Sequence, residues 1–363
     1  MSYNSFRPGE KWVDTNGSPI QAHGGSVLYV GGTYYWYGEN KEKTTGEDDT
    51  WHWGVRCYAS EDLYNWEDKG IIIQPEVDHP DSSLHPASMM DRPHIIYNKD
   101  TGKYVCWLKI MNKDNTQTET VMTADDILGP YEKVREGLKP LGMSAGDFDL
   151  AVAPDGKAYY YFERVHSETI CADLTPDYTD VTGYYSTHFP HSGPPYVREA
   201  TAHFVRKGKH YLLTSGTTGY MPNPSEIAIA DTWHGPYTVL GNPHPDDKSN
   251  TSYHSQISSV LKVAGKKDLY IACADRWLPA LMDLEYESYK VMFEKMFSEE
   301  PQEPQEIQGL QEDLNEETME EIKRKDKMIK NTSIADYVWL PLRFEGDMAY
   351  IDWKDEWKIE DYD

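Results

Sequence analysis

The sequence predicts an all-β fold, a five-bladed β-propeller with a helical insertion near the C-terminus. The first observation is a repeat, in which a polar residue stands nine positions before a glycine: His23 and Gly32, Asp147 and Gly156, Glu199 and Gly208, Gln256 and Gly265. Asp91 and Gly102 form a fifth copy with a longer turn. Each copy has the pattern of a strand, a tight turn and a second strand. Self-similarity at a period of about fifty residues is typical of a propeller, in which each blade is a small antiparallel sheet.

A second recurring pattern predicts the outer strands of the blades. It occurs at residues 61–73, 125–134 and 231–241, and the last two copies contain Gly-Pro-Tyr. Proline limits strand pairing, which suits the edge strand of a sheet. Five units of four short strands account for most of residues 15–278.

Residues 279–332 depart from the strand pattern and predict a helical insertion. One helix is expected from apolar residues at helical spacing, and a second at 315–330, with a Gln/Glu/Pro stretch between them. We interpret the insertion as an acidic decoration of the propeller, with a lid or a subunit contact as the alternatives. Strand character returns at 337–357, where a hairpin is expected to close the final blade. The whole chain, 1–363, is thus expected to be a single catalytic domain.

Charge and composition exclude several classes of function. The chain has 61 acidic and 35 basic residues, a net charge of −26, so a nucleic-acid backbone or an anionic membrane surface would be repelled. No run approaches the ~20 apolar residues that span a bilayer, and the first residues lack the apolar region of a secretory signal. We therefore expect a cytoplasmic protein without nucleic-acid or membrane partners. The sequence indicates no oligomeric state.

The four cysteines, Cys57, Cys106, Cys171 and Cys273, are far apart and form no CxxC motif. Three of them lie in strand-like segments. We expect small buried hydrophobic residues here, neither disulfides nor metal ligands.

The repeated polar positions should form one cluster, because the inner strands of a propeller begin around the same mouth of its channel. The members are His23, Asp91, Asp147, Glu199 and Gln256. Two carboxylates that converge in an aromatic pocket are the usual apparatus of glycoside hydrolysis. One protonates the leaving oxygen, and on the other side a carboxylate activates water or attacks directly.

Glu199 is the candidate general acid, because small and apolar neighbours should raise its pKa. The alternative is a structural ion pair with an arginine such as Arg198. Asp91 is a candidate base or pKa modulator. Asp147 and Asp149 compete for one role, and the repeat favours Asp147 as alternative base or modulator, against the interpretation as a turn cap.

Four further residues are candidates for substrate binding. His23 could hold a sugar hydroxyl or be a buried structural histidine, and Glu39 ends the first hairpin. Arg276 and Trp277 end the fifth hairpin, where Arg276 could serve a carboxylate or a sugar hydroxyl.

The segments that carry these residues resemble glycoside hydrolase family 43, the five-bladed propeller glycosidases. They are IQAHGGSVLYVGGTYYWYGEN, DRPHIIYN, DGKAYYYFE, REATAHF, SYHSQ, CADRW and YVWLPLRF. They are most similar to the branch of exo-β-1,3-galactanases and some arabinofuranosidases, and they cover most of the chain outside 279–332. The resemblance implies an inverting enzyme with Glu199 as its acid.

In the resembled branch a glutamine stands where other members have the base aspartate, which implies that Gln256 occupies the base position. A normal amide takes no proton from water, so Gln256 would act as an imidic-acid tautomer or position the water. The residues alone favour Asp91 or Asp147 as base, and both possibilities stay open.

The sequence departs from the branch at Asp91, where a longer glutamate is usual, and at Gly146, where an arginine is typical.

The family also implies a possible calcium or other ion in the channel, although no cofactor is required. No loop of oxygen ligands for calcium is present in the sequence.

We therefore expect an exo-acting, inverting glycoside hydrolase that acts on plant cell-wall oligosaccharides. The altered galactanase positions favour terminal α-L-arabinofuranosyl units as the substrate, with β-xylosidase activity as a further expectation. Exo-β-1,3-galactanase is the close alternative. Two rivals are a non-catalytic sugar-binding propeller and a glycoside phosphorylase, which would need a basic phosphate site.

Overall fold

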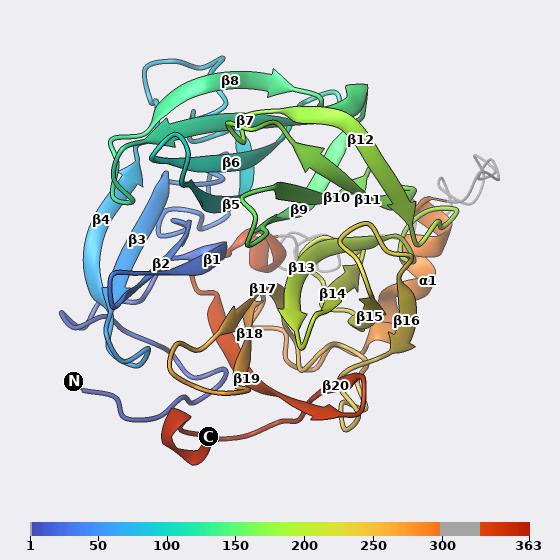
Figure 1. The fold of residues 1–363 in the computed structure, drawn as a ribbon. Coiled ribbons are helices and arrows are strands. Elements are labelled where there is room, and N and C mark those ends of the chain that lie inside the picture. Colours follow the sequence, from blue (N-terminus) through green and yellow to red (C-terminus); the bar gives the residue numbers. More distant parts are fainter. Residues whose placement is uncertain (1, 298–326) are drawn as a thin grey trace, which may run out of the picture.

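The structure is a computed structural model that describes residues 2–297 and 327–363. Five four-stranded antiparallel sheets surround a common centre, as Figure 1 shows. The first strands of the sheets contact one another in a closed ring, in the order β1, β5, β9, β13, β17 and back to β1. The predicted five-bladed propeller is therefore confirmed.

The first two blades each take four consecutive strands from the chain. Blade 1 consists of β1 (His23–Val30), β2 (Thr33–Glu39), β3 (Val55–Ser60) and β4 (Glu67–Ile73). Blade 2 consists of β5 (Met89–Asn98), β6 (Lys103–Met111), β7 (Gln117–Ala124) and β8 (Glu132–Leu138).

Blades 3 and 4 follow the same order. Blade 3 consists of β9 (Ala145–Val152), β10 (Ala158–Arg164), β11 (Glu168–Leu174) and β12 (Val181–His188). Blade 4 consists of β13 (Arg198–Arg206), β14 (Lys209–Gly216), β15 (Glu226–Ala230) and β16 (Thr238–Gly241). A short 3-10 helix, η1 (Pro140–Gly142), precedes blade 3.

Blade 5 combines two distant parts of the chain. Strands β17 (Gln256–Lys262) and β18 (Tyr270–Arg276) pair with β19 (Asp336–Glu345) and β20 (Met348–Ile351). The connection between β18 and β19 contains α1 (Tyr286–Met296), and a 3-10 helix, η2 (Ile359–Asp361), lies near the end of the chain. Most of the helix expected at 315–330 lies outside the described residues, and 327–330 are helical.

The hairpin turns explain the repeated glycines. Gly32, Gly102, Gly156, Gly208 and Gly265 all have positive φ, between 69° and 93°. Glycine adopts this left-handed conformation without the steric cost that a Cβ brings. The repeated glycine therefore marks the turn between the first and second strands of each blade.

Three tryptophans close the ring between blades 1 and 5. The ring of Trp339 on β19 lies 4.6 Å from that of Trp36 and 6.1 Å from that of Trp66, and all three are at most 3% exposed. An aromatic side chain buries about 150–250 Å², at about 25 cal/mol per Å² of apolar area. Contacts across this seam therefore contribute several kcal/mol to holding the last blade against the first.

The four cysteines are free and buried, as predicted. Within residues 2–297 and 327–363, we find no helix with the length and apolar character that a bilayer crossing requires.

Candidate active site

Arg92 connects three polar residues, of which two lie near the starts of inner strands and the third, Glu39, ends β2. Its Nε donates to Asp147 Oδ2 (3.0 Å), and its Nη2 donates to Gln256 Oε1 (2.7 Å). Its backbone N–H donates to Glu39 Oε1 (3.0 Å). The guanidinium of Arg92, on blade 2, thus connects residues from blades 3 and 5, and the backbone N–H of the same residue contacts blade 1.

Two lysines and a tryptophan surround the Asp91 carboxylate. Lys109 Nζ lies 3.2 Å from Asp91 Oδ2 and 2.8 Å from Asp147 Oδ1. Trp51 Nε1 donates to Asp91 Oδ1 (2.6 Å), and Lys41 Nζ lies 3.9 Å from the same oxygen. The structure therefore brings Asp91 and Asp147 together across a shared ammonium group.

These cations keep both aspartates ionised. Burial would raise the pKa of Asp147, but Arg92 and Lys109 outweigh burial and hold that pKa well below its usual range. Burial likewise opposes ionisation of Asp91, and Lys109, Lys41 and the Trp51 hydrogen bond lower its pKa. Both groups carry a negative charge at neutral pH.

The surroundings of Glu199 shift its pKa in the opposite direction. Burial, followed by repulsion from Asp147 and Glu163, raises its pKa well above the usual value, although Lys109 and Arg92 lower it in part. The side chain is only partly exposed. A carboxyl group that stays protonated at neutral pH has the property that a general acid requires.

Arg198 does not pair with Glu199. Its Nε donates to Thr214 Oγ1 (3.0 Å), and its Nη2 donates to the Thr214 carbonyl oxygen (2.8 Å). The alternative of a structural ion pair between these neighbours is therefore wrong. The two side chains point to opposite faces of β13, as consecutive strand residues do.

Irregular backbone follows three of the cluster residues. The pairing register shifts after His23, Asp91 and Glu199, and the next residue in each case, Gly24, Arg92 or Ala200, has a φ between 49° and 63°. Such β-bulges are common beside active sites because they re-aim a side chain. Positive φ at a residue other than glycine costs on the order of 1–3 kcal/mol. Packing around the cluster holds this strained geometry in place.

A second set of polar residues lies opposite the cluster, on the second strand of each blade. The register pairs His23 with Glu39, Asp91 with Lys109, Glu199 with Ser215, and Gln256 with Asp275. Sequence reasoning missed Lys109, Ser215, Asp275 and also Glu163. The available signal was a sixteen-residue spacing, which separates His23 from Glu39, Asp147 from Glu163 and Glu199 from Ser215.

Gln256 is held by three hydrogen bonds. Its Oε1 accepts from Arg92 Nη2 (2.7 Å) and from Trp277 Nε1 (3.2 Å), and its Nε2 donates to Ser215 Oγ (2.9 Å). An amide oxygen has two lone pairs, and both are used here. One amide hydrogen remains to donate to a water or a sugar hydroxyl.

His23 lies behind the cluster rather than at its open side. The imidazole is 0% exposed, its Nδ1 lies 3.0 Å from Asp275 Oδ1, and its Nε2 lies 3.3 Å from the Tyr337 hydroxyl. The Tyr337 ring stacks on it at 4.8 Å. Both ring nitrogens have protein partners, so the geometry favours the buried structural interpretation.

Glu39 is also buried, between the Arg92 backbone and Lys41. Lys41 Nζ lies 2.8 Å from Glu39 Oε2. Burial raises the pKa of Glu39 to about 7, against the effect of Lys41, and repulsion from Asp91 adds to the rise. Glu39 thus helps to hold Lys41 and the Arg92 backbone in place beside Asp91.

Arg276 and Trp277 point in different directions. Arg276 Nη2 donates to the Tyr253 carbonyl oxygen (2.9 Å), and its guanidinium lies 5.7 Å from the Trp353 ring. The structure therefore does not bring Arg276 into the cluster. Trp277 contacts it through Gln256, and its ring lies 4.8 Å from Tyr220.

Two loops meet above the cluster, a contact that the sequence did not predict. The ring of Trp51, from the β2–β3 loop, stacks at 5.7 Å on that of Tyr220, from the β14–β15 loop. Lys41 Nζ donates to the Tyr220 hydroxyl (3.3 Å). Aromatic faces with nearby hydrogen-bond donors suit sugar rings. Both loops lie outside the repeated hairpins, so the repeat carried no signal for them.

One carboxylate beside the channel already has protein partners. Asp149, farther along β9, accepts the His203 backbone N–H (2.7 Å) and the Leu150 backbone N–H (2.8 Å), and lies 3.4 Å from His94 Nε2. Burial raises its pKa to about 7. Calcium takes about 6–8 oxygen ligands. Across the described part of the chain, no group of three or more His, Cys, Asp or Glu side chains could hold a metal.

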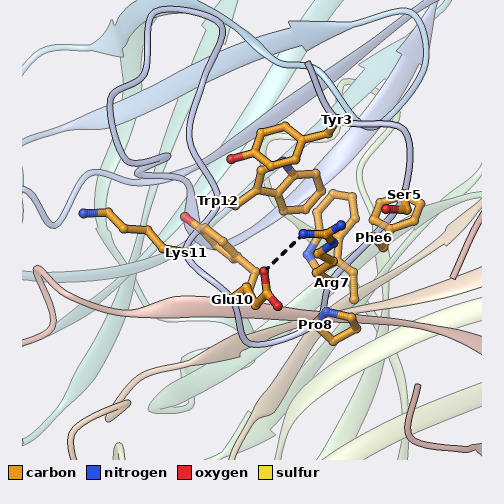
Figure 2. Close-up of a pocket in the computed structure, with 10 residues that line it drawn as sticks. Tyr3, Ser5, Phe6, Arg7, Pro8, Glu10, Lys11 and Trp12 are labelled. Carbon is orange, nitrogen blue, oxygen red and sulfur yellow. Dashed lines mark ion pairs between the residues drawn. The ribbon is translucent and has the colours of Figure 1, made fainter. Parts of the chain in front are cut away.

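A separate small cavity lies beneath the N-terminal segment, as Figure 2 shows. Its volume is about 30 Å³, and Tyr3, Phe6, Arg7 and Trp12 line it. Arg7 Nη1 and Glu10 Oε2 form an ion pair beside it (3.9 Å). A cavity of this size holds about one water molecule, so it is no substrate site.

A propeller that places one carboxyl group with a raised pKa, Glu199, near two with lowered pKa values, Asp91 and Asp147, has the arrangement of a glycoside hydrolase. The profile of glycosyl hydrolases family 43 matches residues 18–278. The chain belongs to this family, which confirms the resemblance seen in its motifs. No curated protein matches the chain.

Solved structures of the same fold include two family 43 β-1,3-galactosidases. One is 28% identical, with a TM-score of 0.76, and the match covers 99% of this chain and 65% of that chain. The other, with galactodeoxynojirimycin, is 25% identical, with a TM-score of 0.74 and coverage of 98% and 100%. An exo-β-1,3-galactanase from Phanerochaete chrysosporium with galactose is 24% identical, with a TM-score of 0.74 and coverage of 98% and 68%. This last likeness shows the fold alone.

Proposed function

We propose that the protein is an exo-acting, inverting β-1,3-galactosidase that releases terminal galactose from oligosaccharides. The observation that carries this proposal is the likeness, over nearly the whole chain, to the two β-1,3-galactosidases. The likeness favours the galactanase alternative over the arabinofuranosyl and xylosyl units that the sequence led us to expect. The first of these relatives is longer, and this chain spans 65% of it.

Glu199 is the general acid in this proposal. Burial and the charges of Asp147 and Glu163 raise its pKa well above the usual value, which favours the protonated form that a general acid needs. As the glycosidic bond breaks, Glu199 donates its proton to the leaving oxygen. Asp147 is saturated by Arg92 and Lys109, so its role is to keep the proton on Glu199.

Asp91 is the general base, and Gln256 positions the water. Asp91 is ionised, and a carboxylate accepts a proton from water, whereas both lone pairs of Gln256 Oε1 are already used. The remaining amide hydrogen of Gln256 can orient the water or a sugar hydroxyl. Inversion follows when the base and the acid act on opposite faces of the sugar.

The stacked Trp51 and Tyr220 rings support an exo mode of action. They join loops from blades 1 and 4 above the cluster, so they obstruct one side of the mouth. A polysaccharide cannot run through an obstructed mouth, but its terminal sugar can enter.

A substrate panel tests the proposed function. The wild-type protein should hydrolyse β-1,3-galactobiose and nitrophenyl β-galactopyranoside faster than the nitrophenyl arabinofuranoside and xyloside. Preference for the arabinofuranoside would restore the expectation from the sequence. No hydrolysis of any of these, together with unchanged oligosaccharide binding by Glu199→Gln, would establish a non-catalytic propeller.

A further inference from the structure

A large basic cavity lies at the opposite end of blades 4 and 5 from the active site. Its volume is about 560 Å³, within the range of about 300–1,000 Å³ typical of small-molecule sites. Its lining includes Arg206 at the end of β13, Lys262 at the end of β17, and Lys207 and Lys267 in the adjoining turns. Arg206 stands seven residues beyond Glu199, about 23 Å along an extended strand.

The charge of this basic cavity contrasts with the rest of the molecule. Four cations line it with two acidic residues, Asp268 and Asp363, whereas the whole chain carries a net charge of −26. An excess of one sign of charge in a cleft concentrates ligands of the opposite sign. The four cations outnumber the two acidic residues of the lining, which favours an anionic ligand.

Part of the cavity wall is rigid. Arg206 is 9% exposed, its Nε donates to Asp268 Oδ1 (2.8 Å), and its guanidinium lies 3.7 Å from the Phe344 ring. Lys262 Nζ donates to the Lys267 carbonyl oxygen (3.1 Å) and so braces the turn. These contacts hold Arg206 and the turn at Lys267 in place without a ligand.

Lys207 and Lys267 supply the mobile charges. Lys207 Nζ is 3.7 Å from Asp268, a carboxylate that Arg206 already neutralises, and its side chain is 70% exposed. The exposed Lys267 side chain has no partner among residues 2–297 and 327–363. Both ammonium groups can therefore turn to a ligand without breaking a strong ion pair.

We propose that the basic cavity binds an acidic sugar, a sugar ring that carries a carboxylate or phosphate oxyanion. The ammonium groups bind the oxyanion, and Tyr362, half-buried in the wall, offers an aromatic face to the ring. The volume exceeds what a bare ion needs, which favours a sugar over free phosphate. The inference goes beyond the proposed function, because none of these residues belongs to the active site.

Calorimetric titration tests this proposal with three probes: digalacturonic acid, neutral β-1,3-galactobiose and inorganic phosphate. Digalacturonic acid should bind the wild-type protein, and the variant with Lys207→Gln and Lys267→Gln should bind it at least tenfold more weakly. A matched variant with Lys99→Gln and Lys157→Gln removes two exposed charges elsewhere and should bind like wild type. Galactobiose hydrolysis should be unchanged in both variants, which shows that they fold and separates this test from that of the proposed function.

Three outcomes would overturn the proposal. The first is an affinity for digalacturonic acid that is equal in wild type and in the Lys207/Lys267 variant. The second is an equal loss in the control variant, which would indicate a general charge effect. The third is inorganic phosphate binding as tightly as the acidic disaccharide, which would leave the sugar ring without a role.

Discussion

At the scale of single residues, neighbouring carboxyl groups acquire opposite protonation states from their surroundings. Asp147 is buried and Glu199 is only partly exposed, and the two groups repel one another, yet of these two only Asp147 contacts Arg92 and Lys109. The cations hold the charge on Asp147, and that charge then holds the proton on Glu199. The contacts of Arg92 and Lys109 with Asp147 thus keep Asp147 ionised and, through its charge, favour the protonated form of Glu199.

Replacing Asp147 should shift the pH profile of hydrolysis. A general acid acts while protonated, so activity is lost as the pH rises through the pKa of Glu199. Asp147→Asn removes a charge that raises this pKa, so the basic limb of kcat/KM should move to lower pH by about one unit. Glu119→Gln is the matched control, since Glu119 is a buried carboxyl group that is no cause of the Glu199 shift. A basic limb that stays in place in Asp147→Asn would contradict this coupling.

Removing the base should allow rescue by an external nucleophile. Asp91→Ala should lower kcat by about 10²–10⁴-fold, and azide should restore turnover with formation of a galactosyl azide. Gln256→Ala should also be slow, but azide should not restore it. The reverse pattern, with rescue of Gln256→Ala alone, would assign the base to Gln256.

At the scale of elements, the bulges near the starts of β1, β5 and β13 set the direction of their polar residues. Gly24 shows why the local sequence matters, since a Cβ there would lie 2.4 Å from Glu39 Oε1. The same oxygen accepts the Arg92 backbone N–H. The conformation of β1 is therefore coupled to the residue that connects the cluster.

Two glycine substitutions separate backbone strain from this coupling. Gly32 and Gly24 both have positive φ, but a Cβ at Gly32 meets no atom within 4 Å. Gly32→Ala should cost about 1 kcal/mol of unfolding free energy with unchanged activity. Gly24→Ala should cost more, about 2–3 kcal/mol, and lower kcat/KM, because Glu39 must move. Denaturant unfolding and initial rates measure both effects, and equal costs with equal activity would refute the coupling.

At the scale of the whole molecule, the propeller holds together where its last blade meets its first. Strands β19 and β20 lie far along the chain from β17 and β18 yet complete the same sheet. Trp339 on β19 contacts Trp36 and Trp66 across this seam.

Truncating Trp339 should weaken the whole fold. Trp339→Ala should reduce the unfolding free energy by about 3–5 kcal/mol, because it empties a buried aromatic cluster. Trp353→Ala, at a residue that is 36% exposed, should cost about 1 kcal/mol. Similar losses for the two variants, measured by denaturant unfolding, would show that the seam is not a principal source of stability.

The sequence predicted the features that repeat from blade to blade. The hairpin glycines, the inner strands and the positions of Asp91, Asp147, Glu199 and Gln256 followed from one spacing. Lys109 and Glu163 obey a related spacing, but it was not recognised. Lys41, Trp51 and Tyr220 lie in loops with no counterpart in other blades, and their positions depend on tertiary contacts that periodicity does not report. Arg276 was proposed because it ends the fifth hairpin, but its neighbour Asp275 contacts His23 whereas Arg276 contacts Tyr253, because adjacent strand residues point to opposite faces.

The sugar specificity was the weakest expectation from the sequence. Departures at Asp91 and Gly146 led us to favour arabinofuranosyl units, whereas the likeness to two β-1,3-galactosidases favours galactose. Asp91 is shorter than the glutamate expected there, and Lys109 and Lys41 fill the space around its carboxylate. Single substitutions in a pocket do not show which sugar it binds when the partners of those residues are unknown.

Proton NMR of β-1,3-galactobiose hydrolysis tests whether Glu199 acts as general acid in an inverting β-1,3-galactosidase. Wild type should release α-galactose first, since inversion of a β-linkage yields the α-anomer, and Glu199→Gln should lower the rate by at least about a hundredfold. Initial release of β-galactose would rule out inversion, and a Glu199→Gln rate close to that of wild type would rule out Glu199 as the acid.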